Sequence, residues 1–274
     1  MMARALTLYA GLVLFFLVAP LLVIVPLSFS AEPYFTFTPA MLSLDPDGYS
    51  LRWYEAVLSN PAWLRALSNS LLIGIASTLL ATSLGTLAAL GLQRRDLPLR
   101  GLITGILISP LVVPIIIAAA GMYFFYSQIG LTGSLLGLVL AHTALGTPFV
   151  VITVSATLSG FDWTLPRAAA SLGADPVTAF FRVTLPLILP GVISGALFAF
   201  ATSFDEVVMV LFLGGPEQRT IPRQIWTGIR EEISPAILAV ATILVLLSGL
   251  LLVAVELLRR RAEALRTIAN LNAA

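Results

Sequence analysis

The stretch that decides the fold is residues 133–158, GSLLGLVLAHTALGTPFVVITVSATL. Over 26 residues it holds no acidic, lysine or arginine side chain, and its one titratable group is His142. A helix needs about 20 apolar residues to cross the hydrocarbon core of a bilayer. Because the run is continuously apolar rather than alternating, a helix that satisfies its own backbone is favoured over a barrel strand. The sequence therefore predicts a membrane-spanning helix here.

Five further runs have the same character, and we expect an all-α polytopic membrane protein with six transmembrane helices. The predicted spans are residues 5–29, 67–92, 101–126, 133–158, 187–213 and 236–258. Across 274 residues, 58% are apolar, 11% are charged and the mean hydropathy is +0.99, as expected of a chain dissolved in lipid. The apolar part of the first run exceeds the roughly 7 to 15 residues of a signal peptide's core, so we interpret it as a retained helix. Residues 1–274 are predicted to form a single transmembrane domain.

Residue types that are absent exclude several mechanisms. The chain has no lysine and no cysteine, and its single histidine is His142. A P-loop and a Schiff-base enzyme both need a lysine, and a thiolate metal site needs cysteine. The net charge of +1 leaves no basic surface for nucleic acid. We expect that this chain binds no metal or cofactor of its own and cannot hydrolyse ATP alone.

The arginines predict the orientation, because positive residues concentrate in cytoplasmic loops. With both termini in the cytoplasm, the inner side holds ten arginines and the outer side holds five. The inner set is Arg4, Arg94, Arg95, Arg100, Arg167, Arg182, Arg259, Arg260, Arg261 and Arg266; the outer set is Arg52, Arg65, Arg219, Arg223 and Arg230. Aromatic residues crowd the first outer loop between positions 34 and 63, as in an interfacial belt.

Small residues three and four apart line one side of the second run and permit the close approach of another helix. They are Gly74, Ser77, Thr78, Ala81, Thr82, Gly85, Thr86 and Ala89. Packing within the chain is favoured over a dedicated dimer motif. Prolines at 110 and 114, and Gly146 with Pro148, predict kinks in the third and fourth spans.

Ionisable residues at membrane depth are treated as functional candidates because burying them is costly. Asp205 and Glu206 stand side by side in the fifth run, about 27 Å from its inner end if the helix is straight. Two interpretations stay open: the pair lines a passage for a cation, or the helix ends earlier and the acids are solvated. His142 is interpreted as a hydrogen-bonded packing residue, and Glu256 as an interfacial partner of Arg259 and Arg260.

Residues 159–186 are too long and too apolar for a plain connection between two spans. Asp162 is predicted to cap a short helix that reaches Leu172 and stops at Gly173. Asp175 and Pro176 are predicted to begin a second short helix that reaches about Leu185. Two short helices that meet at a glycine and expose apolar side chains are typical of a docking site for a soluble partner.

At this loop the chain resembles the inner-membrane permease subunits of binding-protein-dependent ABC importers. Their signature is Glu-Ala-Ala, three residues, Gly, nine residues, Ile-x-Leu-Pro. The matching residues are Ala168, Ala169, Gly173, Val183, Leu185 and Pro186, and Arg167 occupies the position of the signature glutamate. Residues 203–208, 213–216, 220–222 and 233–235 are similar to the polyamine-type permeases and to their opine and aminoethylphosphonate relatives.

The resemblance implies a type I importer fold and partners that this chain lacks. These are two cytoplasmic ATPase subunits that hold ATP and Mg²⁺, a second permease subunit that forms a heterodimer, and an extracytoplasmic solute-binding protein. The implied ATPase-coupling residues are Arg167, Ala168, Ala169, Gly173, Asp175, Phe180, Phe181, Leu185 and Pro186. The location is then the inner membrane of a prokaryote.

For the cargo, the resemblance to polyamine permeases implies that Ser203, Asp205, Glu206 and Trp53 touch or steer an organic cation such as putrescine or spermidine. Alternatives in the same class are an opine, an aminoethylphosphonate and a ferric complex. A secondary transporter driven by an ion gradient is disfavoured, because it would need no docking loop. An enzymatic acid pair is disfavoured too, because adjacent helical residues lie about 100° apart. Residues 221–233 have apolar residues near helical spacing, which predicts a short outer helix or an amphipathic surface loop.

Overall fold

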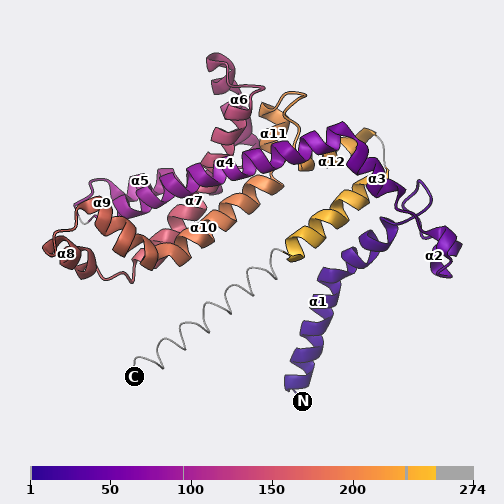
Figure 1. The fold of residues 1–274 in the computed structure, drawn as a ribbon, viewed down its shortest axis with the longest axis horizontal. Coiled ribbons are helices and arrows are strands. Elements are labelled where there is room, and N and C mark those ends of the chain that lie inside the picture. The colour runs from indigo at the N-terminus through magenta and orange to yellow at the C-terminus, as the bar shows by residue number, and fades with distance from the viewer. Residues whose placement is uncertain (1, 95, 232–233, 251–274) are drawn as a thin grey trace. The chain divides into compact units, whose positions relative to one another are not determined.

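The computed structural model describes residues 2–94, 96–231 and 234–250, and its ribbon is drawn in Figure 1. Over the described residues the regular secondary structure is helical, apart from one isolated β-bridge between Ser30 and Tyr49, and turns and loops join the helices. It divides into two compact units, residues 1–64 with 227–274 and residues 65–226. The predictions for Glu256 and for the arginines at 95, 259–261 and 266 lie outside the described residues.

The labelled helices lie over the predicted runs, and the third and fifth runs are each divided. They are α1 (Met2–Leu27), α2 (Pro39–Leu42), η1 (Pro46–Gly48), α3 (Arg52–Ser59), α4 (Pro61–Leu92), α5 (Arg100–Ile108), η2 (Ser109–Leu111), α6 (Ile115–Ile129), α7 (Leu135–Leu158), α8 (Thr164–Ser171), α9 (Pro176–Ala179), η3 (Phe180–Thr184), α10 (Leu185–Asp205), α11 (Val208–Leu213) and α12 (Ile221–Glu231). Within the described residues, four helices are long and apolar enough to span a membrane. A fifth span is present if α5 and α6 are counted as one. The sixth predicted run is helical over Ala236–Leu250, and its remainder lies outside the described residues.

The third predicted span is not one rod. The stretch Arg100–Leu111 and the helix Ile115–Ile129 are bent by 101° at the break between them. Pro110 lies in the first turn of η2, and Pro114 precedes α6 with extended backbone, φ −55° and ψ 128°. Each proline lacks an amide hydrogen, so the α-helical ladder is interrupted twice within five residues. The predicted kink is therefore confirmed, but it is a sharp break. By contrast α7 stays helical through Gly146 and Pro148.

The fifth predicted span also differs from the structure at both ends. The second short helix of the loop does not stop near Leu185, because Pro176–Asp205 is one continuous helical stretch of 30 residues. Its second turn is π-helical over Phe180–Thr184. At the other end the helix stops at Asp205, and a separate helix α11 begins at Val208. The run 187–213 therefore consists of two helices with an irregular joint.

The second unit is built on the contact between α7 and α10, which run side by side (Figure 1). A buried cluster joins α4, α7 and α10 through Ala81, Ala89, Val150, Val154, Leu158, Ile188 and Ala199. A Cβ atom added at Gly85 would lie 2.7 Å from Val150 Cβ, and one at Gly195 would lie 2.8 Å from Val150 Cα. Such close approach needs glycine. The small residues of α4 thus pack within the chain, which confirms the favoured interpretation.

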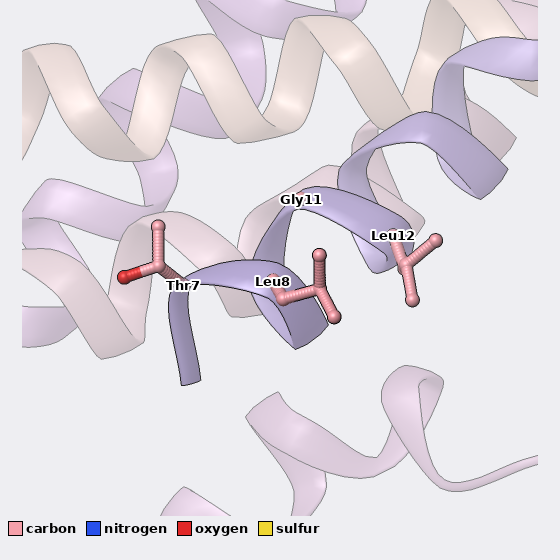
Figure 2. A pocket seen from close by; sticks show the side chains of 4 residues that line it. All are labelled: Thr7, Leu8, Gly11 and Leu12. Carbon is pink, nitrogen blue, oxygen red and sulfur yellow. The ribbon is translucent and has the colours of Figure 1, made fainter. Parts of the chain in front are cut away.

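The first unit holds α1 and the segment that follows it. Ser28 and Tyr54 share a hydrogen bond of 2.6 Å, and the Tyr49 hydroxyl donates to the carbonyl oxygen of Met41. The apolar side chains of α1 between Leu6 and Val23 are largely exposed, as expected of a helix that faces lipid. Figure 2 shows a shallow hollow along α1 that is lined by Thr7, Leu8, Gly11 and Leu12. It contains no ionisable side chain and none of the predicted site residues.

Candidate functional site

Asp205 and Glu206, at the end of α10, have different surroundings. Asp205 is the last residue of α10 and is exposed. Glu206 has extended backbone and is only 9% exposed. Its Oε1 accepts hydrogen bonds from the backbone amides of Val208 at 2.6 Å and Met209 at 3.0 Å. Glu206 is therefore an N-terminal cap of α11, in the favourable direction for the helix dipole.

The interpretation that the helix ends early is correct in part, and the interpretation that the pair lines a passage for a cation stays a prediction. The helix does end earlier than the run of apolar residues suggests, and Asp205 is accessible. Glu206, however, is largely buried, and two backbone amides donate to one of its carboxylate oxygens. Glu206 could be predicted to cap α11 only if the end of α10 at Asp205 had been recognised first.

Ser203 is held in a buried chain of polar side chains from three helices. Ser77 Oγ of α4 lies 3.0 Å from Ser203 Oγ, and His142 Nδ1 of α7 lies 2.7 Å from the same oxygen. Ser203 is 5% exposed and sits two residues before Asp205. This confirms His142 as a hydrogen-bonded packing residue. Its Nε2 has no partner among the described residues.

Trp53 lies on α3 in the first unit, apart in the chain from the other three predicted pathway residues. Its Nε1 donates to the carbonyl oxygen of Ser30 at 2.9 Å, and the Arg52 guanidinium lies 4.3 Å from the centre of its ring. One face of the indole therefore already holds a cation. Ser203, Asp205 and Glu206 lie together at the end of α10, and a shared passage with Trp53 stays a prediction.

The loop at 159–186 is built as two capped turns around a glycine. Asp162 Oδ1 accepts from the backbone amide and the hydroxyl of Thr164, at 2.9 and 2.7 Å. Asp175 accepts from the amides of Val177 and Thr178 and from the Thr178 hydroxyl. Gly173, between them, has φ +90°, a conformation that side chains with a Cβ rarely adopt. The predicted caps and the predicted glycine stop are confirmed.

These hydrogen bonds keep both carboxyl groups ionised. The backbone and hydroxyl bonds from Thr164 hold the pKa of Asp162 below its usual range. The hydroxyl of Thr178 is the main cause of the lowered pKa of Asp175, and the backbone amides of the turn add to it. At neutral pH the loop therefore carries two negative charges that are bound to its own backbone.

The predicted coupling residues separate into anchors and exposed groups. Leu185 packs with Phe161 against the buried cluster of α4, α7 and α10. The rings of Phe180 and Phe181 meet edge to face at 5.0 Å, and Phe181 is 58% exposed. Arg167, Ala168 and Pro186 are exposed, whereas Ala169 is half-buried. Leu172 is 89% exposed and Val177 63% exposed, so the exposed apolar surface includes two residues outside the predicted set.

Sequence reasoning missed the attachment of the loop before α12 to α4. Asn69 Nδ2 donates to the carbonyl oxygens of Glu217 at 2.8 Å and Arg219 at 2.9 Å. Ser70 Oγ accepts from the amide of Ile221, the first residue of α12. Arg65 forms an ion pair with Glu217. Nothing in the spacing of these residues, about 150 positions apart, announced the contact.

Of the two alternatives left open for residues 221–233, the structure shows the short helix. Helix α12 covers Ile221–Glu231, and Arg223 Nη1 donates to the carbonyl oxygens of Gly214 and Gly215. Residue 233 lies outside the described chain. A position across an outer gate stays a prediction. Over the described residues there is no group of three or more histidine, cysteine or acidic side chains that could hold a metal ion.

The sequence of this chain is similar to those of known transport proteins. The sequence model of the family described as "Binding-protein-dependent transport system inner membrane component" matches residues 81–264. The spermidine/putrescine transport system permease protein PotC of Haemophilus influenzae is 31% identical over 90% of this chain and 93% of its own length. The putrescine transport system permease protein PotI of Escherichia coli is 32% identical over 90% of this chain and 88% of its own.

Among solved structures, the fold is similar to that of a bacterial ABC transporter involved in the import of the acidic polysaccharide alginate. The TM-score is 0.74, and the match covers 93% of this chain and 95% of the other. The identity is 14%, so this likeness concerns the fold alone. It confirms the expected helical importer-permease architecture.

Proposed function

Because the chain belongs to the family of inner membrane components of binding-protein-dependent transport systems, we propose that it is the pore subunit of an importer for a small organic cation, a polyamine such as putrescine or spermidine. The observation that carries the substrate class is the identity of 31% to 32% with PotC and PotI over 90% of the chain. The alginate transporter shares the fold at 14% identity, so the fold by itself does not select the cargo.

Asp205 is the side chain best suited to meet the cargo. It is exposed at the end of a membrane-spanning helix, and a carboxylate near a low-dielectric passage attracts an ammonium group. Glu206 and Ser203 then act indirectly: Glu206 holds the start of α11, and Ser203 holds the end of α10 against α4 and α7. Trp53 offers the free face of its ring to a cation, in competition with Arg52.

The chain supplies the passage and no chemistry of its own. It lacks the lysine of a P-loop, so ATP and Mg²⁺ bind instead to two cytoplasmic ATPase subunits that dock on residues 159–186. A second permease subunit completes the pore as a heterodimer, and an extracytoplasmic binding protein delivers the cation. Both termini and the docking loop face the cytoplasm of a prokaryote, as the arginine asymmetry indicates.

The test is transport by the reconstituted complex. We expect proteoliposomes with the full complex and its binding protein to accumulate labelled putrescine only when ATP is supplied on the ATPase side. Spermidine should compete, whereas alginate and phosphonates should not. Uptake driven by a proton gradient without ATP would contradict the proposal, and ATP-dependent uptake of a different solute would correct the cargo alone.

A further inference from the structure

The exposed surface of residues 159–186 combines apolar and positive groups. Leu172, Val177 and Phe181 are all more than half exposed and stand on α8, α9 and the π-helical turn, which pack against one another. Two arginines are exposed on the same elements, Arg167 on α8 and Arg182 on the π-helical turn. The loop is held in shape by its caps, so this surface is formed before any partner binds.

Both carboxylates of the loop accept hydrogen bonds from their own turns. Asp162 and Asp175 together accept five hydrogen bonds, three from backbone amides and two from threonine hydroxyls of their own turns. Their lowered pKa values follow from those bonds. Neither carboxylate forms an ion pair with an arginine within the described chain.

Arg167 has no acidic partner in the part of the chain that the structure describes, because no carboxylate there lies within ion-pair distance of its guanidinium. The helix neighbours three and four positions away are Trp163, Thr164, Ala170 and Ser171, so α8 offers it no acid. An exposed cation at the edge of an apolar surface is the pattern of an interface that a partner completes with an opposite charge.

We propose that Arg167 pairs with a carboxylate on the rim of the ATPase groove that receives Leu172, Val177 and Phe181. This inference rests on the proposed function and adds the charge that the partner must carry. Arg167 stands where the family signature has glutamate, so the pair also distinguishes the cognate ATPase from one whose groove is built for an acid. A lipid surface is the less suitable occupant, because the two aspartates of the loop balance its two arginines and leave no net positive charge for anionic headgroups.

The absence of lysine permits a direct test by zero-length cross-linking. Arg167→Lys keeps the positive charge and introduces the only side-chain amine in the chain. A water-soluble carbodiimide activates a carboxylate, the amine nitrogen bonds to the activated carbonyl carbon, and the carbodiimide leaves as its urea with the carboxyl oxygen. The purified complex should yield one permease–ATPase adduct whose mapped acid lies in the ATPase. The control is Arg94→Lys at the exposed end of α4, which should give no such adduct.

Charge reversal supplies the second measurement. With Arg167→Glu, the amount of ATPase retained on the purified complex at low salt should fall about tenfold or more. Retention by Arg167→Gln should lie between that of the wild type and that of Arg167→Glu. Replacing the mapped acid by arginine should restore retention to Arg167→Glu. If the wild-type chain retains ATPase but Arg167→Glu retains it equally, or if the amine cross-links only to lipid or to the permease, the inference is wrong. If the wild-type chain retains no ATPase, the proposed function itself fails.

Discussion

The docking loop at 159–186 and the acidic joint at 203–213 show two ways in which sequence specifies a site. In the loop, each structural element is encoded by its own residues: Asp162 and Asp175 cap, and Gly173 turns. In the joint, the roles of Ser203 and Glu206 depend on where a helix ends and, for Ser203, on side chains 61 and 126 positions away. The comparison shows that caps and turns can be predicted from a single sequence, whereas polar contacts between helices of a bundle cannot.

The largest expected effect is at the centre of the loop. Gly173→Val forces a β-branched residue to φ +90°, which costs on the order of 1–3 kcal/mol and misplaces α8 against α9. We expect ATPase retention and putrescine uptake to fall at least tenfold. Both can be measured on the same preparation, by quantifying co-purified ATPase and by uptake into proteoliposomes.

The matched control is Gly160→Val in the same loop, where a Cβ meets nothing within 4 Å and φ is ordinary. That variant should retain ATPase normally. Equal behaviour of the two variants would remove the contrast between a locally specified turn and the rest of the molecule.

The next effect separates the two acids of the joint. Asp205→Asn should lower putrescine uptake about tenfold, equivalent to about 1.4 kcal/mol, with little change in the thermal midpoint. Glu206→Ala should instead lower the midpoint, because the amides of Val208 and Met209 lose a cap worth about 0.5–2 kcal/mol. Uptake assays and thermal unfolding in detergent distinguish these outcomes. If Glu206→Ala affected only uptake at unchanged stability, the capping role would be refuted.

A third effect sharpens the dependence on distant residues. Ser203→Ala leaves both Ser77 and His142 without their shared partner and should destabilise the protein by about 1–3 kcal/mol. A double-mutant cycle with Ser77→Ala should give a coupling energy clearly different from zero. Thr104→Ala is a suitable control, because its hydroxyl is exposed and bonds only to its own helix. Additive effects at Ser77 and Ser203 would show that the buried chain does not act as a unit.

The smallest effect is a pH dependence confined to the loop. The folded pKa of Asp175 is below its usual value, so its cap is fully present at neutral pH and is lost as pH falls through that lowered pKa. We expect the loop to become more susceptible to an acid-active protease only at strongly acidic pH. Asp175→Asn keeps a capping oxygen without titrating, and its loop should show no such step. A step of equal size in that variant would assign the pH dependence elsewhere.

Much of the fold was predictable because membrane spans depend on the length of apolar runs. The runs at 67–92 and 133–158 became α4 and α7 with nearly their predicted ends. The prolines at 110 and 114 announced a change of direction but not its size, because a bend of 101° depends on what α6 packs against. The end of α10 stayed open because Ser203 to Val208 carry no glycine or proline to stop a helix.

The candidate site was predicted unevenly for the same reason. Asp175 and Gly173 could be assigned because a cap and a left-handed turn act over three or four residues. The attachment of the loop before α12 to Asn69 and Ser70 could not, since it joins positions about 150 residues apart through backbone groups that every sequence possesses. When a side chain bonds to a backbone group, no partner side chain in the sequence indicates the contact.

The unbroken helical course of Pro176–Asp205 carries a mechanical consequence. At 1.5 Å per residue its 30 residues form a lever about 45 Å long, with the proposed docking loop at one end and Asp205 at the other. A tilt of about 5° at the loop end moves the Asp205 carboxylate by about 4 Å, roughly the width of an ammonium group, by the geometry of a rigid helix. In the proposed importer this helix itself carries a movement of the docking loop to Asp205, and no further element is required between them.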